Sequence, residues 1–99
     1  MQAYHNDSTM RLFRVIASLQ SPDECRAFFE DLCTIKEIQD MAQRLDTAIL
    51  LDHGMSYQKI CEEIGVSTAT ISRVNRALTY GADGYRKALD KISETENTK

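Results

Sequence analysis

Helix-capping signals recur along this chain so regularly that they leave little room for any other secondary structure. Ser21-Pro22-Asp23-Glu24 combines an N-cap serine, a proline suited to the first helical turn and a capping-box glutamate. Thr34-Ile35-Lys36-Glu37 is a second capping box, and Gly54 is suited to the left-handed cap that ends a helix. The chain contains one proline and no strand-like alternation. It is therefore predicted to be all-α, with about six helices.

The same signals predict the domain layout. A chain of 99 residues has the size of one domain, and we expect residues 1–92 to form it. Its expected parts are N-terminal helices over about residues 8–52, a helix-turn-helix over about 56–80 and a C-terminal helix over about 84–93. The polar residues 93–99 are predicted to be a frayed tail.

The first two helices have unusually wide apolar faces. After Ser8, which is placed to open the first helix, come Met10, Leu12, Phe13, Val15, Ile16 and Leu19. The second helix carries Cys25, Phe28, Phe29, Leu32 and Cys33. A small monomer with one core cannot easily cover such faces, whereas a second copy of the chain can. We therefore expect a homodimer formed through the N-terminal helices.

The segment "ICEEIGVSTATISRVNRAL", from Ile60 to Leu78, has the pattern of a helix-turn-helix. Gly65 can supply the positive φ of the turn, and Cys61 is small enough for the close crossing of two helices. The apolar residues that would hold the two helices together are Ile60, Ile64, Val66, Ile71 and Val74. The alternative interpretation is an ordinary helical hairpin.

The second helix of this motif predicts a DNA-reading surface. Short side chains at its leading end would let the backbone approach base edges in the major groove, and hydroxyls and guanidinium groups could bond bases or phosphates. The start of the first short helix is expected to contact the phosphate backbone. The predicted DNA-binding residues are Ser56, Gln58, Ser67, Thr68, Ala69, Thr70, Ser72, Arg73 and Arg76. Arg86 and Lys87 could add phosphate contacts beyond the motif.

The charge distribution agrees with a local DNA contact and not with general polycation behaviour. The net charge is −3, yet residues 66–88 carry Arg73, Arg76, Arg86 and Lys87 against Asp83 alone. For the two arginines of the motif the alternative is plain surface charge. A two-fold dimer would present its two reading helices roughly 34 Å apart, which suits a palindromic site in double-stranded DNA.

The sequence gives little support for disulfides, metal sites, membrane spans or catalytic sites. The odd number of cysteines and the absence of C-x-x-C argue against disulfides and zinc, and favour free thiols in a cytoplasmic protein. His5 and His53 lack metal-ligand spacing, and the adjacent carboxylates Glu30-Asp31 and Glu62-Glu63 point apart on a helix. No apolar run approaches the ~18 residues of a membrane span, and no catalytic motif appears. No enzyme, metal or cofactor is predicted.

From about Thr34 to Leu89 the chain resembles the Trp repressor superfamily, in particular its YerC/YecD group. The resemblance is carried by "TIKEIQDMAQRLDTAILLDHGMSYQKICEEIG" followed by "VSTATISRVNRAL". It implies an all-helical, intertwined homodimer whose N-terminal helices form a shared core, and a sequence-specific transcription regulator.

The resemblance also bears on a small-molecule effector, because the namesake of the superfamily binds tryptophan. Two arginines that are important there match Arg44 and Arg73, which are candidate effector-binding residues. The glycine that makes room for the indole ring is matched by Val74, and a serine near the ligand amino group by Ala77. Because the branched side chain of Val74 would occupy the space of a ring edge, we expect a different effector or none.

The sequence thus predicts a DNA-binding transcriptional regulator, and a repressor in preference to an activator, because so small a domain has little surface to recruit polymerase. The alternative is a protein–protein interaction module that uses the helical pair without reading DNA.

Overall fold

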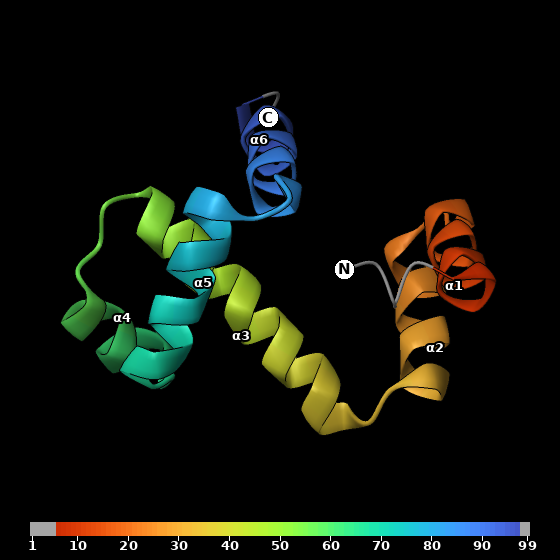
Figure 1. Ribbon diagram of the computed structural model, residues 1–99, viewed down its shortest axis with the longest axis horizontal. Helices are drawn as coiled ribbons and strands as arrows, with labels where there is room; N and C mark the ends of the chain where they lie inside the picture. The colour runs from red at the N-terminus through yellow and green to blue at the C-terminus, as the bar shows by residue number, and fades with distance from the viewer. Residues whose placement is uncertain (1–5, 98–99) are drawn as a thin grey trace. The chain divides into compact units, whose positions relative to one another are not determined.

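The computed structural model describes residues 6–97, which form helices and no strands (Figure 1). The helices are α1 (Asp7–Ser18), α2 (Pro22–Leu32), α3 (Ile35–Asp52), α4 (Tyr57–Ile64), α5 (Thr68–Tyr80) and α6 (Gly84–Asn97). The predicted all-α fold with about six helices is confirmed for the described part of the chain. His5, weighed as a metal ligand from the sequence, lies outside the described residues.

The chain divides into two compact units, Met1–Ile38 and Gln39–Lys99. Helix α3 begins in the first unit and runs through the start of the second. The single domain expected over residues 1–92 is therefore not evident within one chain and stays a prediction.

In the first unit, local side-chain hydrogen bonds set the starts of the helices. Asn6, and not Ser8, caps α1: its side chain accepts a bond from the Thr9 amide at 2.9 Å, and the Asn6 amide donates to Thr9 Oγ1 at 3.1 Å. The helix therefore starts at Asp7, before the serine that the sequence suggested. Asparagine competes well for this role because its side-chain oxygen satisfies an otherwise unpaired amide of the first turn.

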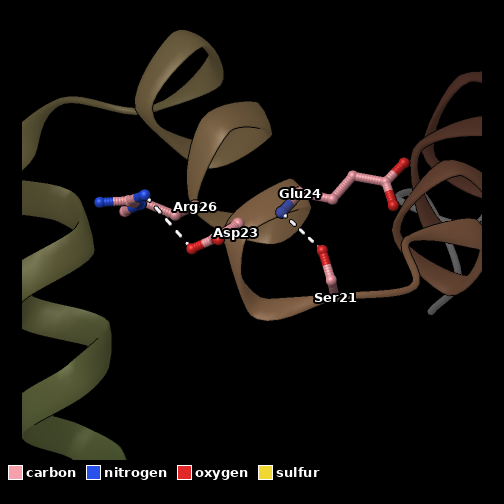
Figure 2. A network of polar contacts seen from close by, with 4 residues as sticks. All are labelled: Ser21, Asp23, Glu24 and Arg26. Carbon is pink, nitrogen blue, oxygen red and sulfur yellow. Dashed lines mark hydrogen bonds and ion pairs between the residues drawn. The ribbon is translucent and has the colours of Figure 1, made fainter.

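Helix α2 starts as its capping signal predicts. Ser21 Oγ accepts a hydrogen bond from the Glu24 amide at 3.0 Å (Figure 2). Pro22 lies in the first turn of the helix. The Glu24 carboxylate reaches back to the Gln20 amide at 3.0 Å. One turn into the helix, Arg26 and Asp23 form an exposed ion pair of 3.3 Å, which Figure 2 also shows.

The first unit has no interior of its own within α1 and α2, since neither helix contains a buried residue. Five large apolar side chains of α1, α2 and the start of α3 are exposed: Met10, Phe13, Val15, Leu32 and Ile35. The Ile35 side chain retains 71% of its accessible surface. The wide apolar faces predicted from the sequence are therefore partly exposed in the single chain, and their other residues are half-buried.

Both ends of α3 are closed by the residues that the sequence indicated. Thr34 Oγ1 accepts from the Glu37 amide at 3.0 Å while Glu37 accepts from the Thr34 amide at 2.8 Å, which is a complete capping box. At the other end Gly54 adopts a φ of 84°. The following amide, that of Met55, bonds the Leu50 carbonyl at 3.0 Å and so satisfies the end of the helix.

The second unit holds the buried core. Its fully or nearly fully buried apolar residues come from every helix of the unit: Ala48, Ile60, Ile71, Val74 and Leu89. Helix α5 contacts both α4 and α6 (Figure 1). Ala48 brings α3 into the same core. Helix α6 continues to Asn97, beyond the end near residue 93 that was expected, so the predicted frayed tail is helical at least to that residue. Residues 98–99 lie outside the described part.

Candidate nucleic-acid interface

Helices α4 and α5 form the helix-turn-helix that the sequence predicts. Gly65 ends α4 with a φ of 88°, and its amide bonds the Cys61 carbonyl at 2.9 Å. A Cβ at Gly65 would meet no atom within 4 Å, so backbone conformation and not space requires glycine there. Ile60 and Ile71 are completely buried, whereas Ile64 and Val66 are half-buried.

The start of each helix in the motif is fixed by a serine. Ser56 Oγ accepts from the Lys59 amide at 3.2 Å, and Ser67 Oγ accepts from the Thr70 amide at 3.1 Å. The Ser67 hydroxyl also donates to Thr70 Oγ1 at 3.2 Å, which commits its proton within the protein. Each serine hydroxyl thus fixes the first turn of its helix, and that of Ser67 is also bonded to a second side chain.

The outer face of α5 is a continuous exposed stripe, which we call the α5 stripe. Its members are Thr68, Ala69, Ser72, Arg73 and Arg76. The buried residues Ile71 and Val74 lie on the other side of the helix, as the 3.6-residue period requires. Ser56, Gln58 and Ser67 are also exposed, whereas Thr70 is half-buried beside Ser67. The structure thus brings eight of the nine predicted DNA-binding residues to the surface of one motif, all but Thr70.

The charge of the α5 stripe is positive and uncompensated. Residues 66–82 contain no aspartate or glutamate. Among the residues that the structure describes, neither Arg73 nor Arg76 has an ion-pair partner. Both guanidinium groups are therefore available to an anion from outside the chain, and phosphate is the anion that their forked geometry suits.

Arg86 does not extend this surface as the sequence suggested. Its Nη2 donates to Asp52 Oδ1 at 2.9 Å, and this ion pair joins α6 to the end of α3. The hydrogen bond to Asp52, followed by the charge of the same carboxylate, raises the pKa of Arg86 above its ordinary value. An arginine held by a carboxylate is a weaker partner for phosphate, so only Lys87 of that predicted pair is exposed and without a described ion pair.

Tyr80 is an exposed residue of α5 that the sequence analysis did not single out. It follows Arg76 by one helical turn and retains 82% of its accessible surface. Its position at i+4 from Arg76 was the available signal, since residues four apart share a helix face.

The two residues weighed for an effector differ in their exposure. Arg44 is half-buried on α3, and Arg73 is exposed on α5. Between these helices Val74 is 2% exposed and contacts Ala48 and Leu89, and Ala77 beside it is half-buried. The side chain of Val74 therefore lies in the contact of α5 with α3 and α6, at the position matched to the glycine that makes room for an indole ring in the namesake of the superfamily.

A small cavity of about 60 Å³ lies elsewhere, between α3 and α6. Its lining is Ile49, Asp52, His53, Leu89, Ile92 and Ser93, and includes neither Arg44 nor Arg73. In residues 6–97 no cluster of His, Cys, Asp and Glu has the makings of a metal site, and the three cysteines are free and half-buried. None of the helices described is long and apolar enough to cross a bilayer.

Comparison with known proteins agrees with this architecture. Residues 7–93 match the family described as Trp repressor protein. The uncharacterized protein YerC of Bacillus subtilis (strain 168) is 57% identical over 86 residues, which cover 87% of this chain and 83% of YerC.

Two solved structures have the same fold. A TrpR-like protein from Eubacterium eligens superposes with a TM-score of 0.90 at 43% identity, covering 94% of this chain and 96% of that one. A crystal structure described as that of a proposed Trp repressor from Staphylococcus aureus superposes with a TM-score of 0.88 at 43% identity. The match covers 94% of this chain and 95% of that one. Members of the family are DNA-binding transcription regulators. By sequence and by fold, this chain belongs to the Trp repressor protein family.

Proposed function

We propose that this protein is a sequence-specific transcriptional repressor that binds a palindromic operator in double-stranded DNA as a homodimer. The α5 stripe is the observation that carries the proposal. It joins small side chains at the leading end of a helix to two unpaired arginines, on a surface without acidic residues in a chain of net charge −3. A surface of this kind can approach base edges closely while neutralising phosphates.

Each predicted contact has a distinct role in the proposed complex. Thr68, Ala69 and Ser72 would face base edges, where hydroxyls bond donors or acceptors and methyl groups contact thymine. Arg73 and Arg76 would bind guanine or phosphate. Ser56 and Gln58, at the start of α4, would bind the backbone together with the free amides of that helix end. Ser67 and Thr70 would act by fixing the geometry of the leading turn.

The homodimer is supported by the uncovered first unit. Helices α1 and α2 have wide apolar faces, and none of their residues is fully buried within one chain. A second copy offers an identical set of faces, so a two-fold arrangement would cover both at once. Two copies would also supply two reading helices for the two halves of a palindrome.

Repression is favoured over activation by size alone. When both of its units take part in dimerisation and DNA reading, a helical domain this small offers little surface for recruiting polymerase.

Selection from random duplexes by the full-length protein tests the proposal. A repressor of this kind enriches a palindrome whose half-sites lie about one helical turn apart, and its affinity falls steeply with salt as counterions are released. Failure to enrich any duplex would overturn the DNA-reading function and favour a protein-binding module. Enrichment of an asymmetric site would overturn the two-fold arrangement but leave DNA binding in place.

A further inference from the structure

Val74 was expected from the sequence to help hold α4 and α5 together, but it lies in a separate contact on the inner side of α5. Val74 on α5, Ala48 on α3 and Leu89 on α6 form one buried cluster. Ile49, Leu51, Leu78, Tyr85 and Ile92 pack around it, whereas the buried Ile60 and Ile71 lie outside it. The cluster therefore attaches the reading helix to α3 and α6, and not to its motif partner α4.

A polar contact spans the same pair of supporting helices. The Asp52–Arg86 ion pair joins the end of α3 to the first turn of α6, at 2.9 Å. Arg86 directly follows Tyr85, which packs on the cluster. Because the Arg86 side chain is 43% exposed, the ion pair contributes less to the free energy of unfolding than the apolar contact does. Its main effect is to fix the orientation of α6.

We propose that Val74 and the Asp52–Arg86 pair are positioning residues, and that they hold α5 in the orientation that reads DNA without any small-molecule ligand. The inference rests on the proposed function and concerns its regulation. A ligand can shift an equilibrium only by binding one state better than another. Since Val74 fills the contact between α5 and its supports, α5 is ordered before DNA arrives, and no ligand is needed to order it.

Amide hydrogen exchange of the full-length protein tests this without DNA. We expect the α5 amides to be as protected as those in the second half of α3, and unchanged by millimolar L-tryptophan or indole. Val74→Ala removes two buried methyl groups and should speed exchange in α5 about tenfold or more. Thr79→Ala is the matched control, because it makes a similar β-branched-to-alanine change on the exposed side of the same helix.

The ion pair is tested by charge exchange. Asp52→Arg alone should speed exchange in α5 and α6, and Asp52→Arg combined with Arg86→Asp should restore part of the protection, which a purely local disturbance would not. Slow α5 exchange that depends on added tryptophan or indole would overturn the proposal. So would α5 protection that is the same in wild type and in Val74→Ala.

Binding measurements with DNA distinguish a failure of the ligand-free attachment of α5 from a failure of the proposed function. With the selected duplex, the Kd of the wild type should stay within about twofold when tryptophan or indole is added, whereas an effector of ordinary strength changes affinity about 5–150-fold. A ligand-dependent Kd overturns the ligand-free attachment and leaves the regulator intact. If no duplex binds, the proposed function fails, while the exchange experiment still decides whether α5 is held internally.

Discussion

Arg86 Nη2 lies 2.9 Å from Asp52 Oδ1, so an arginine expected at the DNA backbone is instead bound to a carboxylate 34 positions earlier in the chain. The contact joins two helices that are not consecutive, α3 and α6. It removes one cation from the predicted DNA surface and leaves Arg73 and Arg76 as the arginines of the motif without a described partner.

The first prediction concerns this ion pair. Asp52→Asn should lower the urea midpoint of unfolding slightly at low salt, and the difference should shrink at high salt, because exposed charges are screened. The sign of the pH dependence follows from the raised pKa of Arg86. An arginine whose pKa is raised by folding stabilises the protein fully at any pH below its pKa in the unfolded chain. This stabilisation is lost only when the pH rises through its pKa in the folded protein, and for arginine both values lie far above neutrality. The difference in urea midpoint between the wild type and Asp52→Asn should therefore be the same at neutral and mildly alkaline pH. If that difference disappeared over this pH interval, the assignment of the ion pair to Arg86 would be contradicted.

The second prediction concerns the two exposed arginines of α5. Arg73→Ala should weaken binding to the selected duplex by roughly 1–3 kcal/mol if Arg73 reads a base, and should relax the preference at one position. Arg76→Ala, if Arg76 binds phosphate, should weaken binding to all sequences alike and reduce the salt slope by about one. Fluorescence anisotropy at several salt concentrations measures both effects. Lys91→Ala, on the exposed face of α6, is the control for removing a positive charge, and an equal effect of all three substitutions would show that net charge alone matters.

The third prediction concerns the turn of the motif. Gly65→Ala should destabilise the protein by about 1–2 kcal/mol, because alanine in the left-handed region brings Cβ close to the backbone. Gly84→Ala is the matched control, since Gly84 has no positive φ and a Cβ there would meet no atom within 4 Å. Chemical denaturation of both variants measures the difference. Equal midpoints would show that the turn relaxes without strain.

The fourth prediction concerns the uncovered faces of the first unit. Phe13→Glu places a charge on the exposed apolar face of α1 and should shift the protein from twice the chain mass to the chain mass in sedimentation at micromolar concentration. Ser8→Glu introduces the same side chain about 140° around α1 from Phe13 and should leave the mass unchanged. A wild-type protein that sediments as a monomer would remove the homodimer from the proposal.

The local features of this fold were predictable because their causes lie within a few residues. The reciprocal bonds of Thr34 and Glu37, the cap at Ser21 and the positive φ of Gly54 and Gly65 all depend on neighbours within one helical turn. Ser8 was predicted to open the first helix, whereas Asn6 caps it, because two good cap formers in the same turn are poorly separated by sequence alone.

The inward and outward sides of α5 were predictable for the same kind of reason. Helical periodicity alone places Ile71 and Val74 opposite Arg73 and Arg76, and the burial pattern follows that period. What periodicity cannot supply is the identity of the surface that covers the inward side, because this depends on helices distant in the sequence.

The sequence by itself therefore determined the number and type of elements, the turn of the motif and the face that α5 presents. Only the tertiary structure decided that Val74 meets Ala48 and Leu89, and that Arg86 is bound by Asp52. The physical reason is the distance along the chain over which each kind of interaction acts. Caps and turns are satisfied by hydrogen bonds inside one turn of chain, whereas packing and ion pairs between α3, α5 and α6 depend on how whole helices approach one another.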